Sequence, residues 1–448
     1  MLGSRIVLFR QFVDDDLGCA SYLIGDEASG VAVVVDPAYE IERYLERAEA
    51  DSVRLVRVLE THTHADHVSG HGRLALDHSL PVSIHTAAEP EYPFEPLEDG
   101  EEIELGAVTV RVLHTPGHRP EHCAFEVVDG ERGDEPWLTL TGDSLFVGDA
   151  ARPDLASEAA EGARGLYRSL QRLMELHDGV EVYPGHVSGS LCGTGMSSKA
   201  SSTIGFERRF NQALRVADED EFISEAIRTG VRPANMDRIV EVNRGPFVGA
   251  PAPLEALNGG GAGALLDVRS AEDFASGHAA GALNVPVDGG SFPTKAAFVL
   301  PPEERVVIHA ASAEQAQRAA LGLRAVAIFD LAGYLVGPPS EERLPPVDLD
   351  ELQRLVEAGE VEVLDVREPH ERDEGYIPGS RNIPYRLVRE WVDDLQGDKP
   401  IVTICSSGPR AAVAASVLAA EGIDARPVVN AGVPDWKGDT VSFRRCGT

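Results

Sequence analysis

The chain contains an internal repeat. Residues 264–269 (ALLDVR) recur 98 residues later as EVLDVR, and residues 281–286 (GALNVP) recur at the same spacing as GSRNIP. Self-similarity at a fixed spacing indicates that one structural unit is present more than once. Each copy shows an apolar strand, a Gly/Pro turn, a second apolar strand and an Ala-rich helix, which predicts a parallel α/β sheet. We therefore expect two copies of one α/β domain in the C-terminal part of the chain.

The part of the chain before the repeat has a different pattern. Short apolar runs such as residues 31–35 end in polar turns, and helical patterns such as residues 165–176 follow some of them. At 448 residues the chain is long enough for about two to four domains. Pro-rich segments at residues 245–253 and 338–346 are typical of joints. The expected domains are residues 1–250, 255–340 and 347–446.

Residues 61–67 read THTHADH and follow the strand-like run 55–59. Histidine or aspartate also follows later strand-like runs, in TPGH, TGD and YPGH. Loops from several strands often converge on one site. Imidazole and carboxylate ligands suit zinc or iron, and two histidines with one carboxylate suit non-haem Fe(II). The pattern predicts a metal site, with these candidate ligands: His62, His64, Asp66, His67, His118, Asp143 and His186.

Residues 61–70 (THTHADHVSG), 142–155 (GDSLFVGDAARPDL) and 232–243 resemble the persulfide dioxygenase branch of the metallo-β-lactamase superfamily. The resemblance covers residues 1–250 and implies an αββα sandwich with one Fe(II) per chain. The ligands of that iron would be His62, His118 and Asp143. Arg152 and Asp154, in the RPD sequence, would bind substrate.

The chain also keeps every side chain needed for a second metal. That second site is expected to stay without metal, and its ligands would be His64, Asp66, His67 and His186. Because this set is complete, a binuclear thiolester hydrolase of the type II glyoxalase kind remains an alternative. The RPD sequence and the attached repeat favour the dioxygenase.

Cys405 opens a second motif, residues 405–410 (CSSGPR). It follows the apolar run 401–404 and precedes an Ala-rich helix, so we expect it at a strand-to-helix turn. Backbone N–H groups at a helix N-terminus favour an anion such as a thiolate, and Arg410 adds a positive charge. The motif resembles a rhodanese active-site loop, and DVRE, YIPGS and NIP upstream match the same family over residues 347–446. Cys405 and Arg410 would be catalytic, whereas Pro409 lacks an N–H that the loop could use.

The first copy of the repeat lacks this chemistry. Aligning residues 306–309 with residues 401–404 places Ala310 opposite Cys405 and Gln315 opposite Arg410. We therefore expect residues 255–340 to adopt a rhodanese fold without transferase activity. A nucleophilic role for His309 or Ser312 is not expected.

The other cysteines differ in their surroundings. Cys192 lies six residues after His186, and fusions of a persulfide dioxygenase with rhodanese domains carry a similar cysteine, so Cys192 is a candidate for accepting sulfur. Cys123 alternates within a strand and is expected in the core. Cys19 and Cys446 are not assigned a function. Five scattered cysteines do not form a disulfide scaffold.

The net charge of −34 argues against nucleic acid and anionic membranes as partners, because both would be repelled. The first residues show no signal-peptide pattern, and no apolar run reaches the roughly 18 residues of a membrane span, so a cytoplasmic protein is expected.

Together, the resemblances imply oxidation of a low-molecular-weight thiol persulfide to sulfite and thiol, coupled to sulfur transfer that gives thiosulfate. The expected partners are thiol persulfide, dioxygen, sulfite and further copies of the chain in a homodimer or homotetramer. A non-catalytic sulfur carrier or sensor is the alternative from another class.

Overall fold

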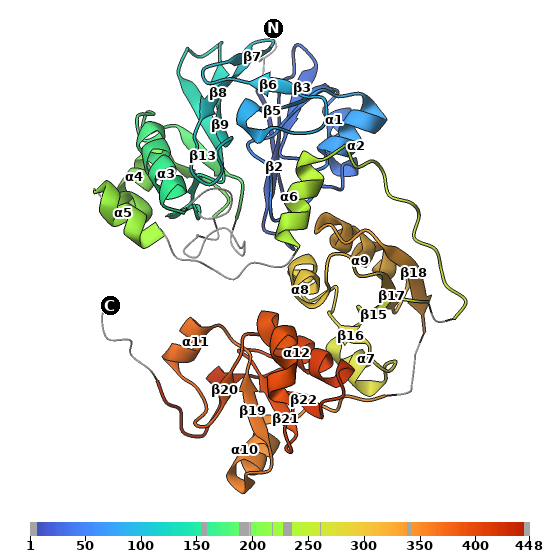
Figure 1. Ribbon diagram of the computed structural model, residues 1–448. Helices are drawn as coiled ribbons and strands as arrows, with labels where there is room; N and C mark the ends of the chain where they lie inside the picture. The colour runs from blue at the N-terminus through green and yellow to red at the C-terminus, as the bar shows by residue number, and fades with distance from the viewer. Residues whose placement is uncertain are drawn as a thin grey trace. The chain divides into compact units, whose positions relative to one another are not determined.

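The computed structural model describes residues 7–153, 159–187, 197, 199–216, 218–226, 235–259, 261–337 and 342–442 (Figure 1). The chain divides into two compact units. The first is Met1–Pro251 with Ala325–Ala327, and the second is Ala252–Arg324 with Ile328–Thr448.

The first unit contains two six-stranded sheets. One has the order β1-β2-β3-β4-β5-β6, and the other has the order β14-β13-β10-β9-β8-β7. The strands of the first sheet are β1 (Val7–Val13), β2 (Ala20–Asp26), β3 (Val31–Val35), β4 (Arg54–Leu59), β5 (Val82–His85) and β6 (Glu95–Leu97). Those of the second are β7 (Glu102–Leu105), β8 (Val108–His114), β9 (Cys123–Asp129), β10 (Pro136–Gly142), β13 (Glu181–Pro184) and β14 (Ser202–Thr203). A separate hairpin is formed by β11 (Leu145–Phe146) and β12 (Asp149–Ala150).

Helices cover the outer faces of both sheets (Figure 1). On the side of the first sheet lie α1 (Glu42–Ala50) and α2 (His71–His78). On the side of the second lie α3 (Ala159–Leu173), α4 (Ile204–Phe210) and α5 (Glu219–Ala226). The remaining helical segments are η1 (Thr86–Ala88), η2 (Ala213–Arg215) and α6 (Met236–Arg244).

Alternation along the strands explains the layers. In β3, Val33 and Val35 pack into a core shared by both sheets, whereas Val34 packs against the helices on the other face. Successive side chains of a strand point to opposite faces, so a strand that is apolar at every position needs cover on both sides. Phe125 of β9 joins the central core from the second sheet. The expected αββα sandwich is confirmed.

The second unit contains two four-stranded sheets, and neighbouring strands in both sheets are parallel. The first copy comprises β15 (Ala264–Asp267), α7 (Ala271–Ser276), β16 (Leu283–Asn284), α8 (Phe292–Val299), β17 (Val306–Ala310), α9 (Ala313–Ala325) and β18 (Leu331–Val336). The second comprises α10 (Leu349–Ala358), β19 (Glu362–Asp365), α11 (Pro369–Glu374), β20 (Arg381–Asn382), η3 (Tyr385–Leu395), β21 (Ile401–Ile404), α12 (Pro409–Ala420), β22 (Ala425–Pro427) and η4 (Val433–Asp435). The predicted repeat of a parallel α/β fold is confirmed.

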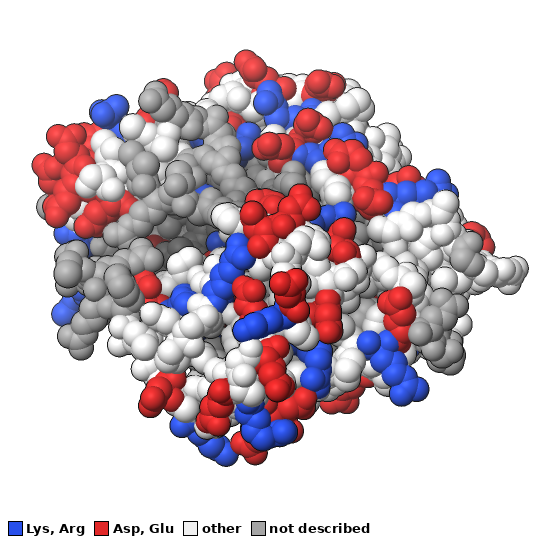
Figure 2. Space-filling model, turned by 60° about the horizontal axis from the view of Figure 1, so that its bottom comes forward, with Lys and Arg blue, Asp and Glu red and all other residues white. Residues whose placement is uncertain are grey.

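Within the described residues, no helix combines the length and the hydropathy that crossing a membrane requires. Figure 2 shows acidic side chains interspersed with basic ones over the visible face.

Candidate metal centre and sulfur-transfer loop

Loops at the ends of several strands build the candidate metal centre. His62 and His64 follow β4, His118 follows β8, Asp143 directly follows β10 and His186 follows β13. Strands β10 and β13 are parallel, and β9 runs antiparallel to both β8 and β10, so the carboxyl ends of β8, β10 and β13 meet at one edge of their sheet. The fold therefore brings together side chains that lie more than 120 residues apart in the sequence.

His62, His118 and Asp143 form the first cluster. Each offers one ligand atom, and these three atoms lie within 4.8 Å of one another. The Nε2 atom of His118 is 3.6 Å from Oδ2 of Asp143, and Nε2 of His62 is 4.0 Å from the same oxygen. All three side chains are buried.

Hydrogen bonds fix which atoms face the centre. Thr61 Oγ1 donates to Asp36 and therefore accepts from Nδ1 of His62, at 2.9 Å. His118 Nδ1 donates to the carbonyl of Arg152, at 3.0 Å. In both rings the proton is held on Nδ1, which leaves the lone pair of Nε2 directed at the centre. Outer hydrogen bonds of this kind are how proteins orient histidine ligands.

Two of the three atoms that face the centre are buried and lack hydrogen-bond partners within the described part of the chain. Buried Nε2 of His62 and buried Oδ2 of Asp143 have none. Leaving a buried polar atom unpaired costs about 1–3 kcal/mol, and more for a charged group. Two imidazoles and one carboxylate with unpaired, converging acceptor atoms fit a divalent metal ion, including Fe(II).

The protonation states also suit a metal. Burial, together with the nearby His64 and His118, lowers the pKa of His62, and burial lowers the pKa of His118. Burial opposes ionisation of Asp143, but the charge of His186 outweighs it and lowers the pKa of Asp143 to about 2. At neutral pH the cluster therefore consists of two neutral imidazoles and one carboxylate, the forms that bind metals.

His64, Asp66 and His67 form a second cluster, again with ligand atoms within 4.8 Å. Nδ1 of His64 and Nε2 of His67 are buried without a partner among the described residues. His186, the fourth residue expected at this second site, differs from the cluster because both of its ring nitrogens have partners. Its Nδ1 contacts Asp143 and its Nε2 contacts Asp66, each at 2.7 Å, so both ring nitrogens are used by carboxylates.

Sequence reasoning missed residues that support the ligands. His122 Nε2 accepts a hydrogen bond from the backbone N–H of Asp143 at 2.9 Å, and its Nδ1 contacts Thr115. Asp36 holds Thr61 through both its backbone N–H and its hydroxyl. A histidine four residues after His118 was the only hint in the sequence, and its meaning depends on the tertiary contact with Asp143.

Arg119 is a second missed residue. Its Nε donates to Glu121 at 2.7 Å, and Glu121 also accepts from the backbone N–H of Thr63, between two histidines of the THTHADH loop. The guanidinium is buried and close enough to lower the pKa of both His62 and His118. Within the described residues its two terminal nitrogens make no hydrogen bond, so they can donate to an anion near the centre.

Asn243, on α6, clamps the loop that carries the histidines. Its amide nitrogen donates to the carbonyls of His64 and His67, at 2.9 and 2.8 Å, and its amide oxygen accepts from the N–H of Ser69, at 2.9 Å. Asn243 is buried. One side chain thereby satisfies three backbone groups of a loop that has no regular hydrogen-bond ladder of its own.

Replacing Asn243 with alanine is expected to lower metal affinity by roughly 10–100-fold, because a residue that holds ligands in place typically contributes that much. It should also lower the free energy of unfolding by about 2–4 kcal/mol, since buried backbone groups lose their partners. Titration with Fe(II) and denaturant unfolding measure both. The matched control is Asn211→Ala. Asn211 is equally buried, and its side chain donates to the carbonyls of Phe146 and Asp149. The Asn211→Ala variant should therefore have a lower free energy of unfolding but an unchanged metal affinity. Equal metal affinity in both variants would contradict the role of the clamp.

Cys405 directly follows β21 and lies at the turn into α12. Its Sγ accepts a hydrogen bond from the backbone N–H of Gly408 at 3.1 Å, and the side chain is buried. Gly408 has φ of 107°, and a Cβ there would come within 2.7 Å of the backbone of Asn430. Only glycine fits this conformation without strain, so the glycine of CSSGPR shapes the loop around the sulfur.

Arg410 is held by a carboxylate. Its two terminal nitrogens donate to the two oxygens of Glu371, at 2.6 and 2.8 Å, and the hydroxyl of Ser406 donates to Glu371 at 2.8 Å. The positive charge expected beside Cys405 is therefore paired within the protein. The sequence alone did not reveal this pairing.

The first copy shows the expected substitution at the same place. Ile404 pairs with Asp365 in the sheet, and His309 pairs with Asp267 at the corresponding position. Ala310 therefore occupies the position of Cys405. The imidazole of His309 is buried and hydrogen-bonded at both nitrogens, to Asp267 and to the carbonyl of Gly337. These bonds give His309 a structural place in the sheet.

The structure describes some of the remaining residues that the sequence analysis considered, whereas others lie outside the described residues. Arg152 contributes its backbone carbonyl to His118. Cys123 is buried in β9, as expected. Cys19 is buried and pairs with His186 in an isolated β-bridge, and burial followed by the charge of Asp66 raises its pKa. The predicted residues Asp154 and Cys192, and also Cys446, lie outside the described residues.

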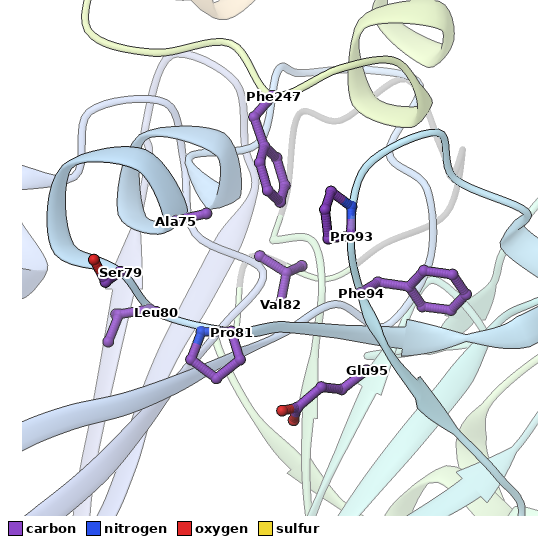
Figure 3. A pocket seen from close by; sticks show the side chains of 9 residues that line it. All are labelled: Ala75, Ser79, Leu80, Pro81, Val82, Pro93, Phe94, Glu95 and Phe247. Carbon is purple, nitrogen blue, oxygen red and sulfur yellow. The ribbon is translucent and has the colours of Figure 1, made fainter.

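A surface groove of about 400 Å³ lies elsewhere on the first unit (Figure 3). In Figure 3, Phe247 points toward Val82 and Pro93. The charged residue in the lining, Glu95, pairs with Arg57. The lining residues are Ala75, Ser79, Leu80, Pro81, Val82, Pro93, Phe94, Glu95 and Phe247. The groove contains no cluster of ligand or nucleophilic side chains and is not the candidate active site.

Comparison with known protein families identifies the domains of this chain. Residues 14–186 match the model of the metallo-beta-lactamase superfamily, and residues 250–337 and 348–439 each match that of the rhodanese-like domain. The chain belongs to the metallo-beta-lactamase superfamily and carries two rhodanese-like domains. The fusion expected from the sequence is thereby confirmed.

Three similar proteins illustrate the relationship. An uncharacterized protein of Mycobacterium leprae is 34% identical over an alignment of 237 residues that covers 46% of this chain and 99% of that protein. The mitochondrial persulfide dioxygenase ETHE1 of Bos taurus is 29% identical over an alignment of 245 residues that covers 53% of this chain and 87% of that protein. The crystal structure of a metallo-beta-lactamase from Staphylococcus aureus is 28% identical, with a TM-score of 0.68, and covers 74% of this chain and 99% of that one.

Proposed function

We propose that this fusion protein oxidises a low-molecular-weight thiol persulfide to sulfite and thiol, and that Cys405 transfers sulfane sulfur to give thiosulfate. The observation that carries the proposal is the cluster of His62, His118 and Asp143, whose ligand atoms lie within 4.8 Å of one another and include two that are buried without a partner among the described residues. Its attachment to a rhodanese-like domain with a cysteine in the active loop supports a substrate that contains sulfane sulfur. The similarity to a persulfide dioxygenase supports the same substrate class.

His62, His118 and Asp143 would hold Fe(II), one per chain. These three side chains would leave coordination positions of the iron open, and the bound Fe(II) would supply the redox chemistry that joins a sulfur anion to dioxygen. The overall reaction balances as RSSH + O₂ + H₂O giving RSH and sulfurous acid, which ionises to sulfite. The sulfane sulfur is oxidised and dioxygen is reduced.

The protein's own residues prepare the site for an anion. Arg119 offers cationic N–H donors beside the ligands, while Glu121 holds its Nε and fixes its orientation. His122 holds the backbone of Asp143, so the carboxylate keeps its place as substrate enters. The ligand side chains and Arg119 are buried, which strengthens each of these electrostatic contacts.

At the second centre, the Cys405 thiolate attacks the outer sulfur of a persulfide, RSS⁻, and RS⁻ leaves. The Cys405–S–S⁻ that forms gives its outer sulfur to sulfite, which produces thiosulfate and restores the thiolate. The N–H of Gly408 donates to Sγ of Cys405 and so favours negative charge on that sulfur. No oxidant is needed in this step.

The test is oxygen uptake by the full chain loaded with Fe(II), with glutathione persulfide as substrate and sulfite and thiosulfate measured as products. Persulfide-dependent uptake with one iron per chain is the expected result. Absence of uptake from protein that contains one iron per chain would refute the dioxygenase proposal.

A binuclear thiolester hydrolase is the second candidate, and the His64, Asp66 and His67 cluster favours it. Metal analysis separates the two. Two metal ions per chain, together with release of thiol from S-lactoylglutathione, would favour the hydrolase.

A further inference from the structure

We propose that Glu371 determines which sulfur donors the Cys405 loop accepts: by neutralising Arg410 it favours monoanionic persulfides over dianionic donors such as thiosulfate. Glu371 does this as a positioning residue, acting through Arg410. The inference rests on the proposed sulfur transfer at Cys405 and is independent of the iron chemistry of the first domain.

The pairing uses the donors that an anionic substrate would need. The two terminal nitrogens of Arg410 face the two carboxylate oxygens of Glu371 in a fork-to-fork arrangement. Such bidentate pairs are strong and directional. One of these nitrogens also contacts the hydroxyl of Ser406 at 3.1 Å, and that hydroxyl donates to Glu371. Glu371 thus engages two polar side chains of the loop, those of Ser406 and Arg410.

Glu371 is itself anchored in its position. Its side chain accepts from the backbone N–H of Glu368 at 3.0 Å, which closes a capping box at the start of α11. Burial opposes its ionisation, but hydrogen bonds from Arg410 prevail and lower the pKa of Glu371 to about 2. The hydrogen bond to Glu371 raises the pKa of Arg410. The pair is therefore ionised at neutral pH.

Pairing of Arg410 with Glu371 lowers the net positive charge beside Cys405, where a sulfur donor would bind. Arg410 lies close enough to Cys405 to interact electrostatically with its sulfur. Without Glu371, a full positive charge would attract an incoming anion in proportion to the charge of that anion. A dianion would gain about twice the free energy that a monoanion gains. With Glu371 in place, a dianion no longer gains more free energy from Arg410 than a monoanion does. The N–H groups of the loop can still bind a singly charged sulfur.

Both donors can perform the same transfer, so the preference concerns binding. Thiosulfate and the Cys405 thiolate give Cys405–S–S⁻ and sulfite, and a persulfide RSS⁻ gives Cys405–S–S⁻ and RS⁻. In each case one S–S bond breaks, another forms, and the leaving group takes the electron pair. Cyanide then accepts the outer sulfur as thiocyanate, which provides an assay free of iron and dioxygen.

The experiment compares KM and kcat of the full chain and its Glu371→Gln variant, with cyanide as acceptor and either thiosulfate or the persulfide of 2-mercaptoethanol as donor; the anion of that persulfide carries a single negative charge. Glutamine keeps the shape and an acceptor oxygen but removes the charge. We expect KM for thiosulfate to fall about fivefold and KM for the persulfide about twofold, with kcat little changed, which is the range for a partly exposed charge pair. The single variant Arg410→Gln leaves the negative charge of Glu371 without its partner, so it should raise KM for thiosulfate more than KM for the persulfide.

The matched control is Glu368→Gln. Glu368 makes a similar bidentate pair with Arg386, at 2.9 and 2.6 Å, three residues earlier in the chain. The Glu368→Gln variant should have the same KM for each donor as the unmodified chain. Thermal unfolding of each variant establishes that it is folded. An equal change for both donors, or a loss of kcat without a change in the KM ratio, would overturn the role of Glu371. Absence of transfer from either donor in the unmodified chain would instead refute the function of Cys405 itself.

Discussion

Replacing Asp143 with asparagine is expected to lower the iron affinity of the first domain by more than about 100-fold, beyond the 10–100-fold typical of residues that only support ligands. Asparagine has nearly the same shape but no charge, so the centre would keep two neutral imidazoles and lose the anionic oxygen of Asp143. Persulfide-dependent oxygen uptake should fall with the iron content. Elemental analysis and an oxygen electrode measure the two quantities on the same sample.

The control for this substitution is Asp26→Asn. Asp26 is also a buried carboxylate of the first domain, and it accepts hydrogen bonds from the backbone of Ala28 and Ala107, far from the candidate ligands in the sequence. That variant should keep its iron and its activity. An Asp143→Asn protein that bound one iron per chain as tightly as the unmodified protein would show that Asp143 is not a ligand.

Replacing Cys405 with serine is expected to lower sulfur transfer by about 1,000-fold or more, as the loss of a catalytic nucleophile does. A serine hydroxyl is not ionised at neutral pH and cannot carry a sulfane sulfur. Transfer from thiosulfate to cyanide measures the loss. Oxygen uptake with a persulfide, measured on the same protein, should be unchanged, because the iron ligands are in another domain.

Ala310→Cys in the Cys405→Ser background provides a contrast. Ala310 stands where Cys405 stands in the other copy, but Gln315 replaces Arg410, and its amide oxygen accepts from the N–H of Ala311. We expect this variant to transfer no sulfur. Transfer by Cys405→Ser at the unmodified rate would refute the assignment of Cys405.

Most of the fold could be predicted from the sequence, because the patterns that indicate strands and repeats lie within short stretches of the chain. Apolar runs ending in polar turns predicted the strands, and the repeat of ALLDVR predicted that two similar sheets would follow. The register of His309 against Asp267, and of Ile404 against Asp365, agrees with the alignment that placed Ala310 opposite Cys405. Side-chain periodicity along a strand depends on neighbouring residues only, so it can be read without the tertiary structure.

The sequence by itself determined which side chains this protein has for chemistry: the THTHADH loop, the later histidines and aspartate, and a cysteine before a helix. Only the tertiary structure decided which of their atoms are available. Thr61 and Arg152 set the tautomers of His62 and His118, Asn243 holds the histidine loop, and Glu371 neutralises Arg410. Hydrogen bonds and charge pairing depend on distances of about 3 Å between residues that can be any number of positions apart, and no local pattern encodes those distances.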